Sequence, residues 1–218
     1  MINIEKIKVV GFDLDKTLYP QSDDIDREIK SYIFQKIDEH LKCGLDVARE
    51  LFNDIYQEGK GSSVSQALNT LKVPDAKNIV QKALENANFS KYLKPNEVDL
   101  NTLYKIKEKY KNIDLLTGSV RENALEKLNS LEINQDIFNN KFFGDDASKS
   151  DGEMYRMWMD CYEFQPENFM NVGDREFSDC LVPQKLGISS ILVNQEKEDL
   201  EHVFPKLKRF VDLENILL

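Results

Sequence analysis

Short apolar runs rich in β-branched residues alternate with longer segments of helical spacing along most of this sequence. Each run is flanked by polar or glycine-containing turns, as expected for strands buried on both faces of a parallel sheet. Strands that alternate with helices predict an α/β fold. The predicted strands are 7–12, 113–116, 142–143, 169–172 and 188–193, and the predicted helices around them are 98–110, 120–131, 154–162 and 178–186.

A block of helical sequence interrupts this alternation directly after the first predicted strand. Apolar residues recur there at three- and four-residue steps, with Ser22, Asp23 or Asp24 available to cap the first helix. We therefore predict an all-α subdomain, residues 19–94, inserted into an α/β core formed by residues 1–18 and 95–218. The four predicted helices run from Ile25 to Leu41, Leu45 to Tyr56, Val64 to Leu71 and Ile79 to Ala87.

Composition and charge narrow the classes of partner. The chain has 218 residues, 39 acidic and 29 basic, and its formal net charge is −10. A surface of this sign repels phosphate backbones and anionic membranes, so we expect neither nucleic acid nor a membrane as a partner. The first ten residues are too short and too charged for a secretory signal, and no apolar window is long enough to span a membrane.

The cysteines indicate a reducing environment. Cys43, Cys161 and Cys180 are odd in number and far apart, which fits neither a disulfide framework nor a Cys-x-x-Cys metal site. Free thiols are usual in a reducing compartment, so we expect a cytoplasmic location.

Two acids separated by one residue, Asp13 and Asp15, follow the first predicted strand. Acids that close repel each other, so at the end of a buried strand they need a compensating cation or a chemical role. Ligands of open parallel sheets bind beyond the carboxyl ends of the strands. Further polar residues follow the other predicted strands at that edge, namely Thr117, Gly118, Lys149, Asp174 and Asp179.

This series of residues resembles the haloacid dehalogenase superfamily. Asp13-Leu14-Asp15-Lys16-Thr17 is similar to the family's first motif, acid-x-acid-x-Thr, and Thr117 matches the second motif. Lys149 matches the third motif, and Gly173-Asp174 with Asp179 matches the fourth. The motifs occur in the family's order over essentially the whole chain. The resemblance implies a three-layer Rossmann-like core with a helical cap inserted after the first motif.

The resemblance also implies a role for each acid. Asp13 would be the nucleophile and a metal ligand, and Asp15 would lend its backbone carbonyl to the metal. The Asp15 side chain would act as general acid on the leaving oxygen and then as base on the hydrolytic water. Asp174 and Asp179 would complete the metal site. Three carboxylates that converge are stable only around a hard divalent cation, and oxygen ligands with a phosphate substrate favour Mg²⁺.

The remaining motif residues would bind the phosphate. Thr117 would hold a phosphoryl oxygen through its hydroxyl, and Gly118 through the neighbouring backbone. Lys149, both catalytic and phosphate-binding, would neutralise charge during the reaction. Substrate choice would lie in the cap, and the polar loop 59–63 and Tyr19 are the candidate contacts.

These residues predict a Mg²⁺-dependent phosphatase that hydrolyses a small phosphorylated metabolite through an aspartyl-phosphate. Hydrolysis of carbon–chlorine bonds is disfavoured, because no leaving alcohol would then need the acid at position 15. Two alternatives stay open: a phosphomutase of sugar phosphates that uses the same residues, and a binding module on a scaffold without catalysis.

Overall fold

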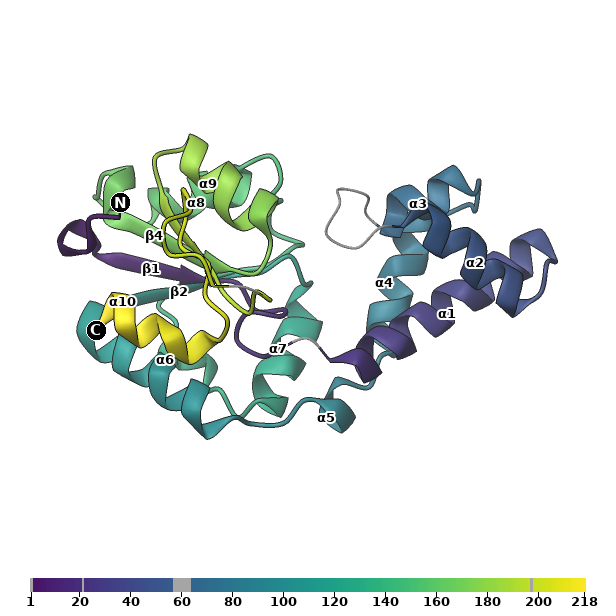
Figure 1. The fold of residues 1–218 in the computed structure, drawn as a ribbon, viewed down its shortest axis with the longest axis horizontal. Helices are drawn as coiled ribbons and strands as arrows, with labels where there is room; N and C mark the ends of the chain where they lie inside the picture. Colours follow the sequence, from purple (N-terminus) through teal and green to yellow (C-terminus); the bar gives the residue numbers. More distant parts are fainter. Residues whose placement is uncertain (1, 21, 57–63, 197) are drawn as a thin grey trace. The chain divides into compact units, whose positions relative to one another are not determined.

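The computed structural model describes residues 2–20, 22–56, 64–196 and 198–218 (Figure 1). The chain folds as two compact units, one formed by Met1–Gln21 with Leu93–Leu218 and the other by Ser22–Tyr92. None of the described helices is long and apolar enough to span a lipid bilayer.

The first unit is built on a five-stranded sheet in which every pair of neighbouring strands is parallel. This confirms the α/β fold expected from the alternation of strands and helices. The strand order is β3-β2-β1-β4-β5. The strands are β1 (Val9–Phe12), β2 (Asn112–Leu116), β3 (Lys141–Phe142), β4 (Phe169–Gly173) and β5 (Ser189–Leu192).

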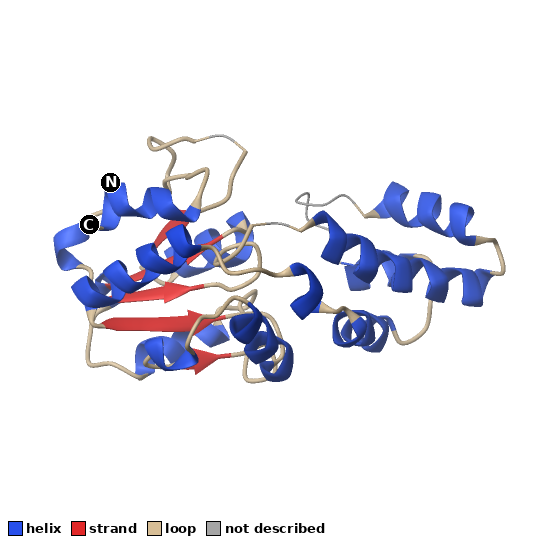
Figure 2. Ribbon diagram, turned by 90° about the horizontal axis from the view of Figure 1, so that it is seen from below, coloured by secondary structure: helices blue, strands red, loops and turns tan. Residues whose placement is uncertain are grey.

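Helices cover both faces of this sheet, which gives the three layers expected (Figures 1 and 2). In Figure 1, α8 (Glu153–Asp160) and α9 (Val182–Lys185) lie on one face, and α6 (Glu97–Tyr110) and α10 (Glu214–Leu217) lie on the other. The core under α8 and α9 contains Trp158 and Phe169, whose rings meet edge to face at 4.9 Å between centroids. Helix α7 (Arg121–Ser130) follows β2.

Most predicted element ends of this unit lie within one or two residues of the observed ones, and two of the differences have a clear physical cause. The strand predicted from residue 7 begins at Val9, because Ile7 caps a short 3-10 helix, Ile4–Lys6. The helix predicted over 178–186 is instead a π-helix, Glu176–Leu181, that passes into α9. A π-turn contains more residues than an α-turn, and no hydrophobic period in the sequence distinguishes the two.

In the second unit, Ser22–Tyr92, the described residues form helices joined by turns, and the unit has its own core. Ser22 caps its first helix by accepting a hydrogen bond from the Ile25 N–H. Leu41 and Leu45, expected on apolar faces, are 38% and 53% exposed because they flank the turn between two helices. The helices are α1 (Asp23–Leu41), α2 (Leu45–Ile55), α3 (Val64–Thr70), α4 (Ala76–Asn86) and α5 (Phe89–Tyr92). The loop 59–63, a candidate for substrate contact, lies outside the described residues.

Candidate active site

The register of the sheet brings the polar strand ends together. Phe12 of β1 lies opposite Leu115 of β2 and opposite Val172 of β4, so these three strands end at the same edge. The Asp13 N–H donates to the Val172 carbonyl at 2.8 Å, which continues the pairing one residue beyond β1. Asp13, Thr117 and Asp174 therefore leave the sheet side by side, at the edge where open α/β sheets bind ligands.

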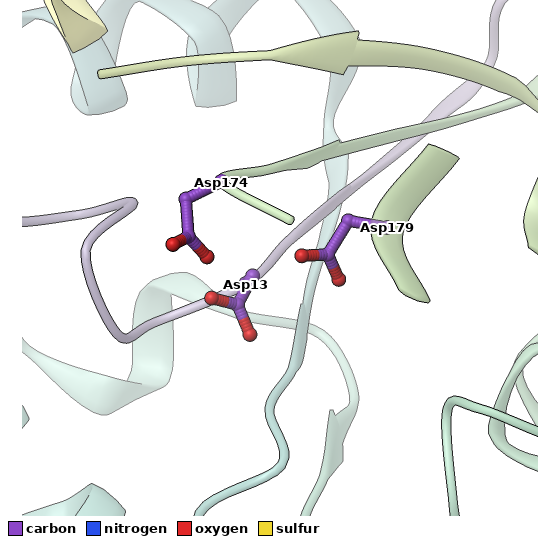
Figure 3. Close-up of side chains that lie close together, drawn as sticks. All are labelled: Asp13, Asp174 and Asp179. Atoms are coloured by element: carbon purple, nitrogen blue, oxygen red, sulfur yellow. The ribbon is translucent and has the colours of Figure 1, made fainter. Parts of the chain in front are cut away.

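Three carboxylates converge at this edge. Asp13, Asp174 and Asp179 each offer an oxygen atom within 4.8 Å of the others, and Figure 3 shows the side chains pointing toward one another. Asp13 and Asp179 are almost completely buried. Asp179 comes from the π-helix, and its side chain lies over Gly173, where an added Cβ would stand only 2.4 Å from the Asp179 Cγ. Glycine at position 173 is what allows this approach.

Two polar side chains hold the π-helix in place behind the carboxylates. The Asn171 amide donates to the Asp179 carbonyl at 2.8 Å, and the Tyr155 hydroxyl donates to the Ser178 carbonyl at 2.9 Å. The Arg175 N–H donates to Asp179 Oδ2 at 3.0 Å. Because a side chain supported in this way is pre-oriented, Asp179 does not need to reorganise to bind a cation.

Lys149 lies between two of the acids. Its Nζ donates to Asp13 Oδ1 at 2.6 Å and to Asp179 Oδ1 at 2.7 Å, and the lysine is 8% exposed. Burial lowers the pKa of this ammonium, but the charges of Asp13 and Asp179 outweigh that effect and raise it above its usual value. Lys149 is therefore a buried cation at the site rather than a solvated surface lysine.

Asp13 and Asp174 are hard to ionise without a further cation. Burial raises the pKa of Asp13 to about 6, against the lowering effect of Lys149 and with added repulsion from Asp179 and Asp15. Burial, followed by repulsion from Asp13 and Asp179, raises the pKa of Asp174 to about 8. The charges of Lys149 and Arg175 oppose this rise but do not outweigh it.

The loop after β2 folds back on itself at the same edge. Thr117 is fully buried, and its Oγ1 accepts a hydrogen bond from the Ser119 N–H at 3.0 Å. Gly118 is exposed, and as a glycine it adds no side chain to the loop. An added Cβ on Gly144 would stand 2.1 Å from the Gly118 carbonyl, so the loops after β2 and β3 touch backbone to backbone. The phosphate-binding role of Thr117 and Gly118 stays a prediction.

Asp15 has different partners from Asp13, although only one residue separates them. Its oxygens accept hydrogen bonds from Lys127 Nζ at 2.5 Å, Ser119 Oγ at 2.6 Å and Tyr19 OH at 2.6 Å. Burial by itself would raise the pKa of Asp15. The Lys127 charge and the hydrogen bonds from Lys127, Ser119 and Tyr19 outweigh that effect, so the pKa lies well below its usual value.

The motifs did not reveal Lys127 or the role of Ser119. Lys127 lies on the face of α7 that also carries Ala124 and Leu128, and all three are buried. A lysine at the spacing of an apolar face was the available signal, since lysine is almost never fully buried unless it is paired. Tyr19, a candidate for substrate contact, is buried and donates a hydrogen bond to Asp15, and its contact with a substrate stays a prediction.

The donor set fits a hard divalent cation. Asp13, Asp174 and Asp179 supply carboxylate oxygens only, with no sulfur or imidazole ligand in the group. Oxygen donors of this kind suit Mg²⁺ or Ca²⁺ better than zinc or copper. The raised pKa values of Asp13 and Asp174 agree with a site that needs a positive ion to hold all its acids ionised.

Comparisons with known proteins agree with this fold. A family model described as haloacid dehalogenase-like hydrolase matches residues 10–193. Comparison with the curated proteins found no match. A solved HAD phosphatase from Thermococcus onnurineus superposes with a TM-score of 0.70 at 18% identity, over 97% of this chain and 98% of that one.

Two further solved structures have the same fold. One is a protein provisionally described as a β-phosphoglucomutase, from Thermotoga maritima, with a TM-score of 0.65 at 23% identity over 97% of this chain and 98% of that one. The other is a haloacid dehalogenase-like hydrolase from Streptococcus pneumoniae, with a TM-score of 0.69 at 15% identity over 98% of this chain and 100% of that one. Identities this low show a shared fold and nothing about the substrate.

Proposed function

Because the chain belongs to the haloacid dehalogenase-like hydrolase family, we propose that it is a Mg²⁺-dependent phosphatase of small phosphorylated metabolites. The observation that supports this proposal is the convergence of Asp13, Asp174 and Asp179 around one point, with the Lys149 ammonium bound to two of them. This arrangement combines a nucleophilic carboxylate, an oxygen-donor cation site and a fixed positive charge. Transfer of a phosphoryl group through an aspartyl-phosphate uses all three.

The first step is attack by an Asp13 carboxylate oxygen on the phosphorus. The bond from phosphorus to the leaving oxygen breaks, and that oxygen takes a proton from the Asp15 carboxyl. The second step reverses these roles: a water gives its proton to Asp15, attacks the phosphorus, and releases Asp13 with inorganic phosphate. Splitting the hydrolysis through an aspartyl-phosphate divides one difficult step into two easier ones.

The chain's own residues support both steps. Lys149 neutralises phosphoryl oxygens beside Asp13, and the loop at Thr117 and Gly118 binds another. Asp13, Asp174, Asp179 and the Asp15 carbonyl would hold Mg²⁺, which when bound withdraws charge from the phosphoryl group.

The two steps place different demands on Asp15. Its contacts with Lys127, Ser119 and Tyr19 keep it ionised before substrate arrives, which suits the base of the second step. For the first step Asp15 takes up a proton from the solvent as the phosphate dianion approaches, because a nearby like charge raises a carboxyl pKa.

The insert of residues 19–94 is proposed as a cap that selects the substrate and excludes water from the acyl phosphate. The predicted lack of nucleic-acid and membrane partners rests on the net charge of −10 alone.

The central test is phosphate release from p-nitrophenyl phosphate with Mg²⁺ present. We expect the wild-type chain to turn over and Asp13→Asn to lose at least about 10³-fold in kcat, since the nucleophile is gone. Asp160→Asn, which changes an exposed acid at the end of α8, is the matched control and should keep full activity.

Product analysis separates this proposal from its alternatives. With sugar phosphates, formation of an isomer in place of inorganic phosphate would identify a phosphomutase, which would use the same residues. No turnover of any phosphate ester with Mg²⁺ bound would favour a binding module and contradict the enzyme assignment.

A further inference from the structure

A second lysine is buried beside the active site, where it contacts Asp15 and Ser119. Lys127 of α7 is 2% exposed, and its Nζ donates to Asp15 Oδ1 at 2.5 Å and to Ser119 Oγ at 2.8 Å. Burying an ammonium is costly unless it is paired and hydrogen-bonded. Lys127 is distinct from Lys149, whose partners are Asp13 and Asp179.

The contacts of Lys127 close a ring around the Asp15 carboxylate. The Ser119 hydroxyl accepts from Lys127 and donates to Asp15 Oδ2 at 2.6 Å, and the Tyr19 hydroxyl donates to Asp15 Oδ1 at 2.6 Å. Both carboxylate oxygens are therefore held, by groups from α7, the loop after β2 and the loop after β1. Even so, 31% of the Asp15 side chain stays exposed, which leaves it accessible to a substrate.

A ring of this kind has two possible uses. One is purely structural: the ring ties the loops after β1 and β2 together. In that case, loss of Lys127 would weaken the fold and slow the hydrolysis of every substrate equally. The ring could instead fix the direction in which the Asp15 oxygens face. Proton transfer requires donor and acceptor within hydrogen-bond reach, so the orientation of Asp15 decides how well it serves the leaving oxygen.

We propose that Lys127, through its contacts with Asp15 and Ser119, is a positioning residue that aims the Asp15 carboxyl at the leaving oxygen, an assignment that rests on the phosphatase function proposed above. An exposed aspartate could rotate freely, whereas this one is held by a charge-assisted bond, which is shorter and stronger than a neutral one. The lysine reaches the reaction only through Asp15 and touches no reacting atom.

The proposal predicts a dependence on the leaving group. A phenolate with a nitro group leaves readily without a proton, while an unsubstituted phenolate needs one. In Lys127→Met, which keeps the length of the side chain and removes its charge, kcat/KM for phenyl phosphate should fall about 10- to 100-fold. For p-nitrophenyl phosphate, the fall should stay within about threefold. General acid catalysis is worth 10²–10⁴-fold in total, so a misaimed acid loses part of that.

Two more variants make the test decisive. Lys127→Arg keeps the charge and should recover activity on phenyl phosphate relative to Lys127→Met. Ser119→Ala keeps the lysine and removes one bond to Asp15, so it should show the same selective loss in smaller degree, even if Lys127→Met does not fold. Tyr162→Phe removes the hydroxyl that donates to the buried Asp114, in a different hydrogen-bonded network. It is the control for a general loss of stability and should show no selective effect on either ester.

The outcomes are distinct. The positioning role would be overturned if kcat/KM fell equally for both esters, or if neither Lys127→Met nor Ser119→Ala lowered it. The proposed phosphatase function would stay intact in both cases. A wild-type chain that releases no phosphate from either ester would overturn the proposed function, and the assignment of Lys127 with it.

Discussion

Asp13 and Asp15 are two residues apart in one loop, yet their surroundings move their pKa values in opposite directions. Asp13 is buried among other acids, which raises its pKa to about 6 despite Lys149. Asp15 is only partly buried, and Lys127 and two hydroxyls keep its pKa low. Neighbouring carboxyl groups whose pKa values are pushed apart are the usual mark of different chemical roles. The environment of each residue, rather than its type, separates the proposed nucleophile from the proposed acid and base.

The raised pKa values predict a pH-dependent affinity for Mg²⁺. Asp13 and Asp174, with pKa values of about 6 and about 8, must lose protons before a cation binds. The affinity should therefore rise at least about tenfold as the pH increases from about 5 to about 9, measured by calorimetric titration. Asp174→Asn removes the carboxyl with the higher pKa, so any remaining binding should level off above about pH 7. Equal affinity at both ends of the range would contradict the assignment of these ligands.

The same shift has a consequence for stability without metal. The pKa of Asp174 is about 8 in the folded chain against 3.8 for an unperturbed aspartate, so the folded state keeps a proton that the unfolded chain has released. Stability from this carboxyl is present below about pH 4 and is lost as the pH rises to about 8.

Among the elements, the π-helix Glu176–Leu181 places Asp179 in the three-carboxylate cluster. It brings Asp179 back over the end of β4, where only a glycine leaves room for the side chain. Single π-turns often occur at functional sites, and here the physical reason is placement of a ligand. An ordinary α-turn would contain fewer residues and would point Asp179 in a different direction.

We expect Gly173→Ala to displace this element. The new Cβ would stand 2.4 Å from the Asp179 Cγ, so the π-helix has to shift. Unfolding experiments should show a loss of about 1–3 kcal/mol, as for other overpacked sites. Titration should show Mg²⁺ binding weakened about 10- to 100-fold, as when support of a ligand is lost.

Gly118→Ala is the matched control for stability, since a Cβ added there would meet no atom of the described residues within 4 Å beyond its own chain neighbours. Its unfolding free energy should change by less than about 0.5 kcal/mol. Gly173→Ala with wild-type stability and wild-type Mg²⁺ affinity would refute the importance of the close approach.

Taken as a whole, the chain has two units with separate hydrophobic cores. The core of Ser22–Tyr92 contains Phe52, Ile33 and Ile37, and the core under α8 contains Trp158 and Phe169. Units that do not share a core can open independently. This independence would let the sequence of the insert change without disturbing the sheet.

The two cores predict unfolding confined to one unit. Phe52 is fully buried, with ring contacts to Phe34 and Tyr56, so Phe52→Ala should cost about 3–5 kcal/mol. Hydrogen exchange should then show lost protection within residues 22–92 and retained protection in β1 and β4. Phe169→Ala, in β4, is the reciprocal variant and should lower protection in the sheet. Loss of protection in both units from Phe52→Ala would show that the chain unfolds as one cooperative body.

Local sequence patterns were enough to predict the parallel α/β architecture and the helical character of residues 23–92. They also identified the polar residues that stand at the strand ends, and the resemblance to the haloacid dehalogenase family, which the family match confirms. The burial of a strand and the period of a helix are both visible in neighbouring residues of the sequence. The carboxyl ends of parallel strands lie at one edge of the sheet. Asp13, Thr117 and Asp174 could be placed together on that basis.

The surroundings of each acid, in contrast, depend on how the chain folds in three dimensions. The pairing of Asp15 with Lys127 joins residues 112 positions apart, and Lys149 reaches Asp13 across 136 positions. No local pattern specifies such distances. No hydrophobic period signals the π-turn that carries Asp179 either, and the room that Gly173 leaves for the Asp179 side chain is seen only in the folded chain. Charges and side-chain volumes meet only after the chain has folded, and they set the pKa values on which the proposed chemistry depends.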